Sequence, residues 1–193
     1  MPLSIQSAIP LRRSVIPAEP TDAALADAIA GVRVGAPAAI AVVYGWYAAD
    51  LVRLLTRLMG ARADAEDAVH DLFVGLPEHL GRYDERGRFR PWLRATAIGI
   101  ARMHVRRTNR RAAVLARETQ ESLRTATPGD LSLTMDVERA VAGLSDPLRA
   151  VFVLRHWEGF SHDEIAALLD ITPGASRVRH ARALEILRSQ LDR

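Results

Sequence analysis

Hydrophobic residues recur at the spacing of an α-helix along most of this chain, and polar runs separate the helical stretches. A short helix is predicted from Thr21, a good N-cap, to about Gly31. A longer one is predicted from about Pro37 to Met59, where Gly60 ends it. No segment shows the strict alternation that predicts a strand, so the pattern favours an all-α fold.

A third helix is predicted from Asp64 as N-cap, with acidic residues in its first turn that interact favourably with the helix dipole. Val69, Leu72 and Phe73 form an apolar stripe on it. Pro77 is expected to bend or break this helix, because proline removes a backbone hydrogen bond.

A polar, glycine-containing connector, "GRYDERGRFR", precedes a fourth helix that begins near Pro91, where a missing N–H costs least. Its predicted inward face consists of Leu93, Ala97, Ile100, Ala101 and Val105. Residues 112–135 then change character and include the linker-like stretch "TATPGDLS". Helices are predicted again from about Asp136 to Leu144 and from Ser145 to a stop at Gly159.

This organisation predicts two small helical domains joined by a linker, the second containing a helix-turn-helix. The expected parts are an N-terminal tail (1–20), a first helical domain (21–111), the linker (112–135) and a second helical domain (136–193).

The segment "SHDEIAALLDITPGASRVRH" is typical of two short helices around a sharp turn. Ser161 and Glu164 have the spacing of a capping box, and Ile171 is a candidate apolar plug between the helices. Thr172 is placed to cap the next helix, with Pro173 in its first position. In a helix-turn-helix the second helix lies in the major groove, where arginine donates two hydrogen bonds to guanine. A plain helical hairpin with a solvated basic face is the alternative.

The positions of the charged residues along the chain are more informative than their total number. All 26 basic residues are arginine and the formal net charge is +3, which codon usage in a GC-rich genome explains without DNA binding. Ten of these arginines lie between Arg82 and Arg111, beside Tyr83, Phe89 and Trp92. The run fits a phosphate-binding track, since each neutralised phosphate adds affinity, or equally a solvated helix face.

Other chemistries find little support. The chain has no cysteine, which fits a reducing cytoplasm, and it contains no phosphate-binding glycine loop or nucleophile elbow. His156 and His162 lie near one another without a third ligand. We therefore expect no enzyme activity, no cofactor and no metal. The most apolar stretch, "AAIAVVYGWYAADLV", is shorter than the ~20 residues that span a bilayer, so a cytoplasmic protein without membrane insertion is expected.

The two modules together resemble bacterial RNA polymerase sigma factors of the small, extracytoplasmic-function type. The stretch "RADAEDAVHDLFVGLPEHLGRYDERGRFRPWL" resembles the family's second conserved region, which docks on the polymerase clamp and opens the promoter. "LSDPLRAVFVLRHWEGFSHDEIAALLDITPGASRVRHARALEIL" resembles its fourth region, which recognises the minus-thirty-five element. The resemblance implies promoter-specific transcription initiation, with core RNA polymerase, promoter DNA and an anti-sigma factor as partners.

The resemblance also implies roles for individual residues. Polymerase binding is expected from Asp67, His70, Asp71 and Phe73. DNA binding near the minus-ten element, where the connector captures a flipped base, is expected from Arg82, Tyr83, Arg86, Arg88, Phe89, Arg90, His104, Arg106, Arg107 and Arg110. DNA binding by the recognition helix is expected from Ala175, Ser176, Arg177, Arg179, His180 and Arg182.

Some residues depart from the family pattern. Ile98 and Gly99 stand where arginine and asparagine are frequent, and Ser176 and His180 stand where apolar residues are usual. Two alternatives remain at this point. One is a stand-alone helix-turn-helix regulator, and the other is a sigma-like protein that needs an accessory factor to open promoters.

Overall fold

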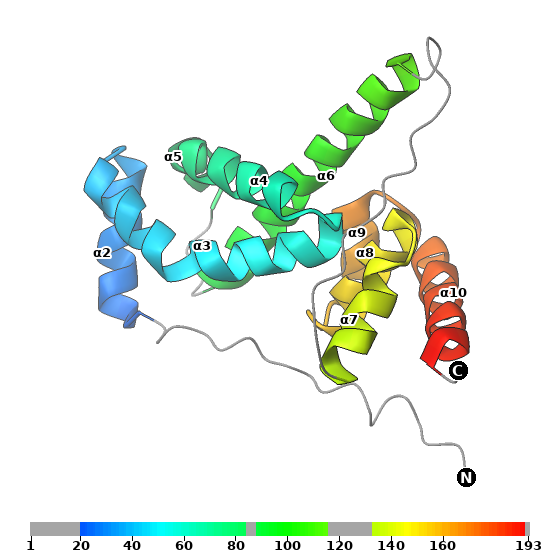
Figure 1. Cartoon of the computed structure of the whole chain (residues 1–193). Coiled ribbons are helices and arrows are strands. Elements are labelled where there is room, and N and C mark those ends of the chain that lie inside the picture. The colour runs from blue at the N-terminus through cyan, green and yellow to red at the C-terminus, as the bar shows by residue number, and fades with distance from the viewer. Residues whose placement is uncertain (1–19, 84–87, 116–132, 192–193) are drawn as a thin grey trace. The chain divides into compact units, whose positions relative to one another are not determined.

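The computed structural model describes residues 20–83, 88–115 and 133–191, and every regular element within these ranges is a helix (Figure 1). The helices are α2 (Asp22–Arg33), α3 (Pro37–Met59), α4 (Arg62–Val74), α5 (Leu76–Leu80), α6 (Phe89–Leu115), α7 (Leu133–Ala142), α8 (Asp146–His156), α9 (His162–Leu169) and α10 (Pro173–Leu191). The all-α fold predicted from the sequence is confirmed.

The helices form two compact units, one built mainly from α2 to α6 and the other from α7 to α10. Helix α6 continues to Leu115 and α7 begins at Leu133, so helices cover both ends of the stretch predicted as linker. The remainder of that stretch, 116–132, lies outside the described residues, as does the predicted tail up to residue 19. The exact domain boundaries stay predictions.

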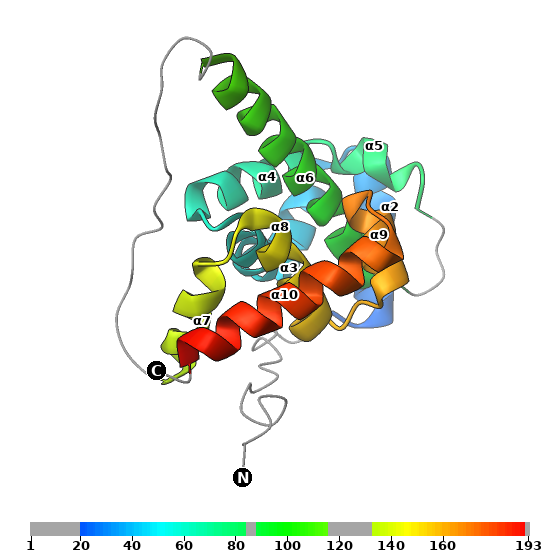
Figure 2. The same cartoon turned by 90° about the vertical axis from the view of Figure 1, so that its right-hand side faces the viewer.

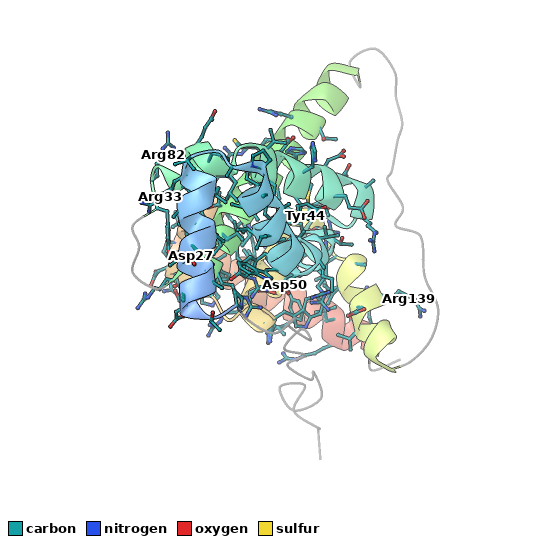
Figure 3. All side chains as sticks on the ribbon, turned by 90° about the vertical axis from the view of Figure 1, so that its left-hand side faces the viewer. Asp27, Arg33, Tyr44, Asp50, Arg82 and Arg139 are labelled. Atoms are coloured by element: carbon teal, nitrogen blue, oxygen red, sulfur yellow. The ribbon has the colours of Figure 1, made fainter. Side chains whose placement is uncertain are left out.

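Helix α3 provides much of the core of the first unit. Leu51, Leu54 and Leu55 on α3 are almost completely buried. The ring of Tyr44 on α3 contacts Phe73 of α4, with centroids 4.9 Å apart. α2 packs against α5. Figure 3 shows the side chains of the chain as sticks, with Tyr44 and Asp50 of α3 labelled. The apolar stripe predicted on the third helix is confirmed, because Val69, Leu72 and Phe73 are all buried.

Two predicted helix ends in this unit were wrong. Helix α2 does not end at Gly31 but continues to Arg33, and the backbone enters the left-handed region at Gly35, with φ 71°. Helix α4 begins at Arg62 after an extended Ala61, so Asp64 is a first-turn residue and not the N-cap. Its carboxylate keeps the favourable position near the positive end of the helix dipole.

The break expected near Pro77 is present, although Gly75 rather than the proline marks it. Helix α4 ends at Val74, and Gly75 serves both as its C-cap and as the N-cap of α5. Pro77 lies in the first turn of α5, where proline lacks only a hydrogen bond that a helix start does not make. The proline therefore begins a new short helix.

Helix α3 is longer than the apolar stretch seen in the sequence. Its 23 residues make it, by length and composition alone, long and apolar enough to cross a membrane. A core helix meets the same criteria. The ion-paired Asp50 and the buried leucines of α3 place this helix in the core of the first unit.

In the second unit α10 packs along α7, α8 and α9 (Figure 2). Phe152, Leu154, Ile165 and Leu187 are among its most buried side chains. Helix α8 begins after Ser145 as predicted. Helix α7 lies earlier than the predicted 136–144 segment, because Gly143 and Leu144 form the turn that follows it.

Candidate nucleic-acid interface

Local sequence chemistry sets the geometry of the helix-turn-helix. At the start of α9 Ser161 Oγ accepts from the backbone N–H of Glu164, and Glu164 Oε2 accepts from the backbone N–H of Ser161 at 2.8 Å. These hydrogen bonds hold the pKa of Glu164 below its ordinary value. The predicted capping box is confirmed, and it fixes where α9 begins.

The turn between the two helices relies on Asp170 and Thr172. Asp170 adopts φ 56°, the left-handed conformation that short polar side chains tolerate better than branched ones. Thr172 Oγ1 then accepts from the backbone N–H of Ala175 at 3.1 Å, which confirms the predicted cap of α10. Ile171, the predicted plug, is partly buried. The chain thus turns sharply and presents the start of α10.

One face of α10 is open to solvent. Its exposed side chains near the N-terminus are those of Arg177, Val178, Ala181 and Arg182. Ala175, Arg179 and His180 are partly buried, and Ser176 is completely buried. Because Ser176 faces the core, its side chain is not available for contact with DNA. Val178 is 54% exposed on this face, but the sequence analysis did not predict it as a DNA-binding residue. Its spacing of four residues from Arg182 could have indicated that the two side chains share a face.

The two residues of α10 that depart from the family pattern face inward and meet histidines of other helices. His162 Nδ1, at the start of α9, lies 2.9 Å from Ser176 Oγ. The His180 ring lies 5.0 Å from the ring of His156 on α8 and 5.5 Å from that of His162, between centroids. We call these four residues the histidine cluster. Polar side chains here replace the apolar contacts that usually join a recognition helix to its support.

The surroundings of this cluster disfavour positive charge. Burial lowers the pKa of His180 to about 4, helped by His156, His162 and Arg155. Burial first and then Arg155 lower the pKa of His156. The pKa of His162 is lowered by burial, Arg155 and Arg177, against an opposing effect of Asp163. The imidazoles are therefore neutral near pH 7.

The basic end of α6 offers a second cationic surface. Arg106 and Arg107 are exposed, in keeping with a role in phosphate binding. His104 Nε2 lies 2.7 Å from Asp71 Oδ2. His104, which the sequence predicts to bind DNA, therefore contacts Asp71, which it predicts to bind polymerase. The side chain of Arg110 lies outside the described residues. Ile98, which replaces a frequent arginine, is buried in the core.

Aromatic residues around the connector pack on one another. The ring of Phe89 lies 5.6 Å from those of Tyr47, Tyr83 and Trp92, between centroids. Tyr83 and Phe89 are buried and Trp92 partly so. The rings of Tyr83 and Phe89 fill the junction of α3 and α6, so they do not offer exposed faces on which bases could stack.

The arginines of the connector divide into two groups. Arg82 and Arg88 are exposed, and Arg86 lies outside the described residues. Arg90 is partly buried and donates from Nη2 to Asp50 Oδ2 at 3.3 Å. This contact holds Arg90 against α3.

The helix expected to face polymerase presents an acidic surface. Asp67, His70 and Asp71 on α4 are exposed, whereas Phe73 is buried against Tyr44. Phe73 therefore supports this surface from within. In the described ranges of the chain, no group of three or more histidine, aspartate and glutamate side chains could hold a metal ion.

Comparison with known families assigns both units. The family described as "Sigma-70 region 2" matches residues 43–111, and "Sigma-70, region 4" matches residues 134–187. Together these matches cover well over half of the chain. They include α4, most of α6, all of α9 and most of α10.

Several curated proteins are similar along most of their length. RNA polymerase sigma factor CarQ of Myxococcus xanthus is 34% identical over 161 residues, which cover 82% of this chain and 92% of that protein. ECF RNA polymerase sigma factor SigE of Mycolicibacterium smegmatis is 30% identical, covering 75% of this chain and 58% of that protein. The sigma-E factor of Haemophilus influenzae is 27% identical over 184 residues, 89% of this chain and 95% of that protein.

Solved structures show the same fold. Sigma factor RpoE in complex with the anti-sigma factor NepR from Bartonella quintana gives a TM-score of 0.55 at 22% identity, covering 74% of this chain and 90% of that chain. CnrH in complex with the cytosolic domain of CnrY gives 0.53 at 24% identity, covering 88% and 97%. From the family matches and the curated relatives, the chain belongs to the sigma-70 family and is an extracytoplasmic-function sigma factor, which directs core RNA polymerase to initiate transcription at specific promoters.

Proposed function

We propose that this sigma factor recognises the upstream promoter element through the exposed face of α10 and opens the downstream element with the α4–α6 unit. Arg177 and Arg182 supply rigid planar donors for guanine edges, and Val178 supplies an apolar contact beside them. Arg82, Arg88, Arg106 and Arg107 bind phosphates of the separated strands. The exposed Asp67, His70 and Asp71 bind the polymerase.

The observation that carries this proposal is the exposed arginine face at the start of α10. A capping box, a left-handed Asp170 and the Thr172 cap fix the direction of that helix. Side chains on its first turns would then meet base edges when the helix enters the major groove.

Three further features belong to the same proposal. The protein works in the cytoplasm, where its polymerase is, and it performs no catalysis of its own. It is also held inactive by an anti-sigma factor. The complex of RpoE with NepR supports that partner, since the two sigma chains share their fold.

Run-off transcription with purified core polymerase on genomic fragments tests the function. We expect discrete transcripts that depend on this protein. Polymerase binding without transcripts would favour a requirement for an accessory factor, and no polymerase binding would favour a stand-alone regulator.

The substitution Arg177→Ala tests the base contacts. Each good bidentate contact contributes about 1–3 kcal/mol, so we expect roughly 5- to 150-fold weaker binding of the upstream element. Arg188→Ala, in the last turn of the same helix, is the matched control and is expected to bind normally. Equal affinity of the Arg177 variant and wild type in a mobility-shift titration would remove Arg177 from the set of base contacts.

A further inference from the structure

Asp50 is an unusual residue for the interior of a helical unit. It lies in the middle of α3 and is only 4% exposed (Figure 3). Burying an isolated carboxylate is costly unless positive charges and hydrogen bonds compensate for the lost water. The neighbourhood of Asp50 must therefore contain such partners.

Three arginines surround this carboxylate. Arg53 Nη2, one turn further along α3, lies 3.4 Å from Oδ1. Arg90 and Arg94 on α6 share the other oxygen, with their Nη2 atoms 3.3 and 3.6 Å from Oδ2. Because Arg90 and Arg94 are four residues apart, they lie on one face of the first turns of α6. Asp50 thus joins α3 to the start of α6.

Three guanidinium groups lie within 3.6 Å of this one carboxylate. The side chains of Arg90 and Arg94 remain 22% and 21% exposed, so part of each guanidinium reaches solvent. Guanidinium groups fixed in position bind phosphate oxygens at a lower entropic cost than freely moving ones. Asp50 therefore holds the guanidinium groups of Arg90 and Arg94 in fixed positions from which they could bind an anion.

The cluster also lies at the end of the connector. Helix α6 begins at Phe89, directly after Arg88, so Arg90 and Arg94 lie where the connector passes into α6. Asp50, by contrast, is too deeply buried to touch DNA. Any effect that it has on DNA passes through the arginines.

We propose that Asp50 is a positioning residue for promoter opening, which holds Arg90 and Arg94 where they bind phosphates of the separated minus-ten strand. The inference rests on the proposed function of the α4–α6 unit, and it adds Arg94 to the DNA-binding residues. It assigns a role in promoter opening to a helix that carries none of the DNA contacts expected from the sequence.

The test compares full-length variants in holoenzyme with core polymerase. Asp50→Asn keeps the shape of the side chain and removes its charge, whereas Asp27→Asn removes a charge from the surface of α2 as a matched control (Figure 3). Permanganate reactivity of unpaired thymines measures opening. We expect Asp50→Asn to open the promoter about tenfold less, the effect of a weakened charged contact, with unchanged polymerase binding. Asp27→Asn is expected to match wild type.

Removing the arginines separates positioning from structural support. The double variant Arg90→Ala/Arg94→Ala should open poorly, and adding Asp50→Asn to it should cause no further loss. The salt dependence of opening should also become shallower, by about 0.7 in the log–log slope for each lost phosphate contact with a single strand. A merely structural role of Asp50 would lower the thermal midpoint and leave this slope unchanged.

The possible failures are distinguishable. Normal promoter opening by Arg90→Ala/Arg94→Ala would overturn phosphate binding by these two arginines and this inference with it. Impaired opening by that variant, together with normal opening by Asp50→Asn, would overturn only the role of Asp50. The role of Asp50 would also be overturned if Asp50→Asn reduced promoter opening equally in the wild type and in the Arg90→Ala/Arg94→Ala variant. Should Asp50→Asn not fold, Arg94→Gln replaces it, and wild-type opening by that variant would overturn the inference.

Discussion

At the scale of single residues, the histidine cluster shows how two unusual side chains of α10 each meet a histidine of another helix. Ser176 and His180 would be poor choices on the buried face of an isolated recognition helix. In this protein His162 contacts Ser176, and the ring of His156 lies beside that of His180. The Nε2 atoms of His156 and His180 are buried without a hydrogen-bond partner among the described residues. Protonation of His156 or His180 would therefore place a positive charge in a buried site without a hydrogen-bond partner.

This cluster makes stability depend on pH. An unfolded His180 titrates near its ordinary pKa of 6.5, whereas the folded residue titrates near 4. The unfolded chain therefore binds protons first as the pH falls below 6.5. The associated stability is complete above pH 6.5 and declines toward pH 4. His156 and His162 act in the same direction, because their pKa values are also lowered.

Chemical denaturation of the full chain between pH 7.5 and 4.5 measures this effect. Each histidine can contribute a slope of at most about 1.4 kcal/mol per pH unit. His180→Leu, which restores an apolar side chain, should flatten the slope and protect the fold at pH 5. His79→Leu, outside the cluster, is the control. An identical pH profile for wild type and His180→Leu would contradict this account.

At the scale of helices, the sequence predicted best what local chemistry determines. The capping box of α9, the Thr172 cap of α10 and the end of α3 at Gly60 each depend on a few adjacent residues. The start of α4 was misplaced because Asp64 resembles an N-cap although the chain is already helical two residues earlier. The partners of Asp50 and the burial of Ser176 and Phe89 depend on helices distant in sequence, which periodicity does not reveal.

Two glycines inside helices should respond oppositely to alanine. Gly31 on α2 approaches α3 so closely that an added Cβ would lie 2.6 Å from the Cβ of Ala39, so Gly31→Ala should destabilise the protein. Gly99 in α6 has open space around it, so Gly99→Ala should stabilise by about 0.5–1 kcal/mol through the higher helix propensity of alanine.

Urea unfolding of both variants, with Gly45→Ala as a second open helical position, measures these differences. Stabilisation by Gly31→Ala would show that α2 and α3 separate readily. Run-off transcription with Gly99→Ala then asks whether the departure from the family pattern at this position weakens promoter opening.

At the scale of the whole molecule, the two cationic surfaces should contribute differently to promoter binding. In the proposed function Arg106 and Arg107 bind phosphates, which carry no sequence information, whereas Arg177 contacts base edges. Arg106→Ala/Arg107→Ala should weaken binding of all promoters similarly and make the salt dependence shallower. Arg177→Ala should instead reduce discrimination at one base pair.

Holoenzyme binding to a promoter library at several salt concentrations checks this division. Mutated promoters should lose affinity equally with wild type and with the Arg106/Arg107 variant. Loss of discrimination in the Arg106/Arg107 variant would mean that the end of α6 contacts bases as well.

The contacts beneath α10 also limit how recognition helices can be exchanged between relatives. A helix with apolar residues in place of Ser176 and His180 would leave His162 and His156 without their present neighbours. A graft of α10 alone should therefore fold poorly in either direction. Transferring it together with residues 156 and 162 should give chimeras with altered promoter preference, so the exchangeable unit is the helix plus its histidine support.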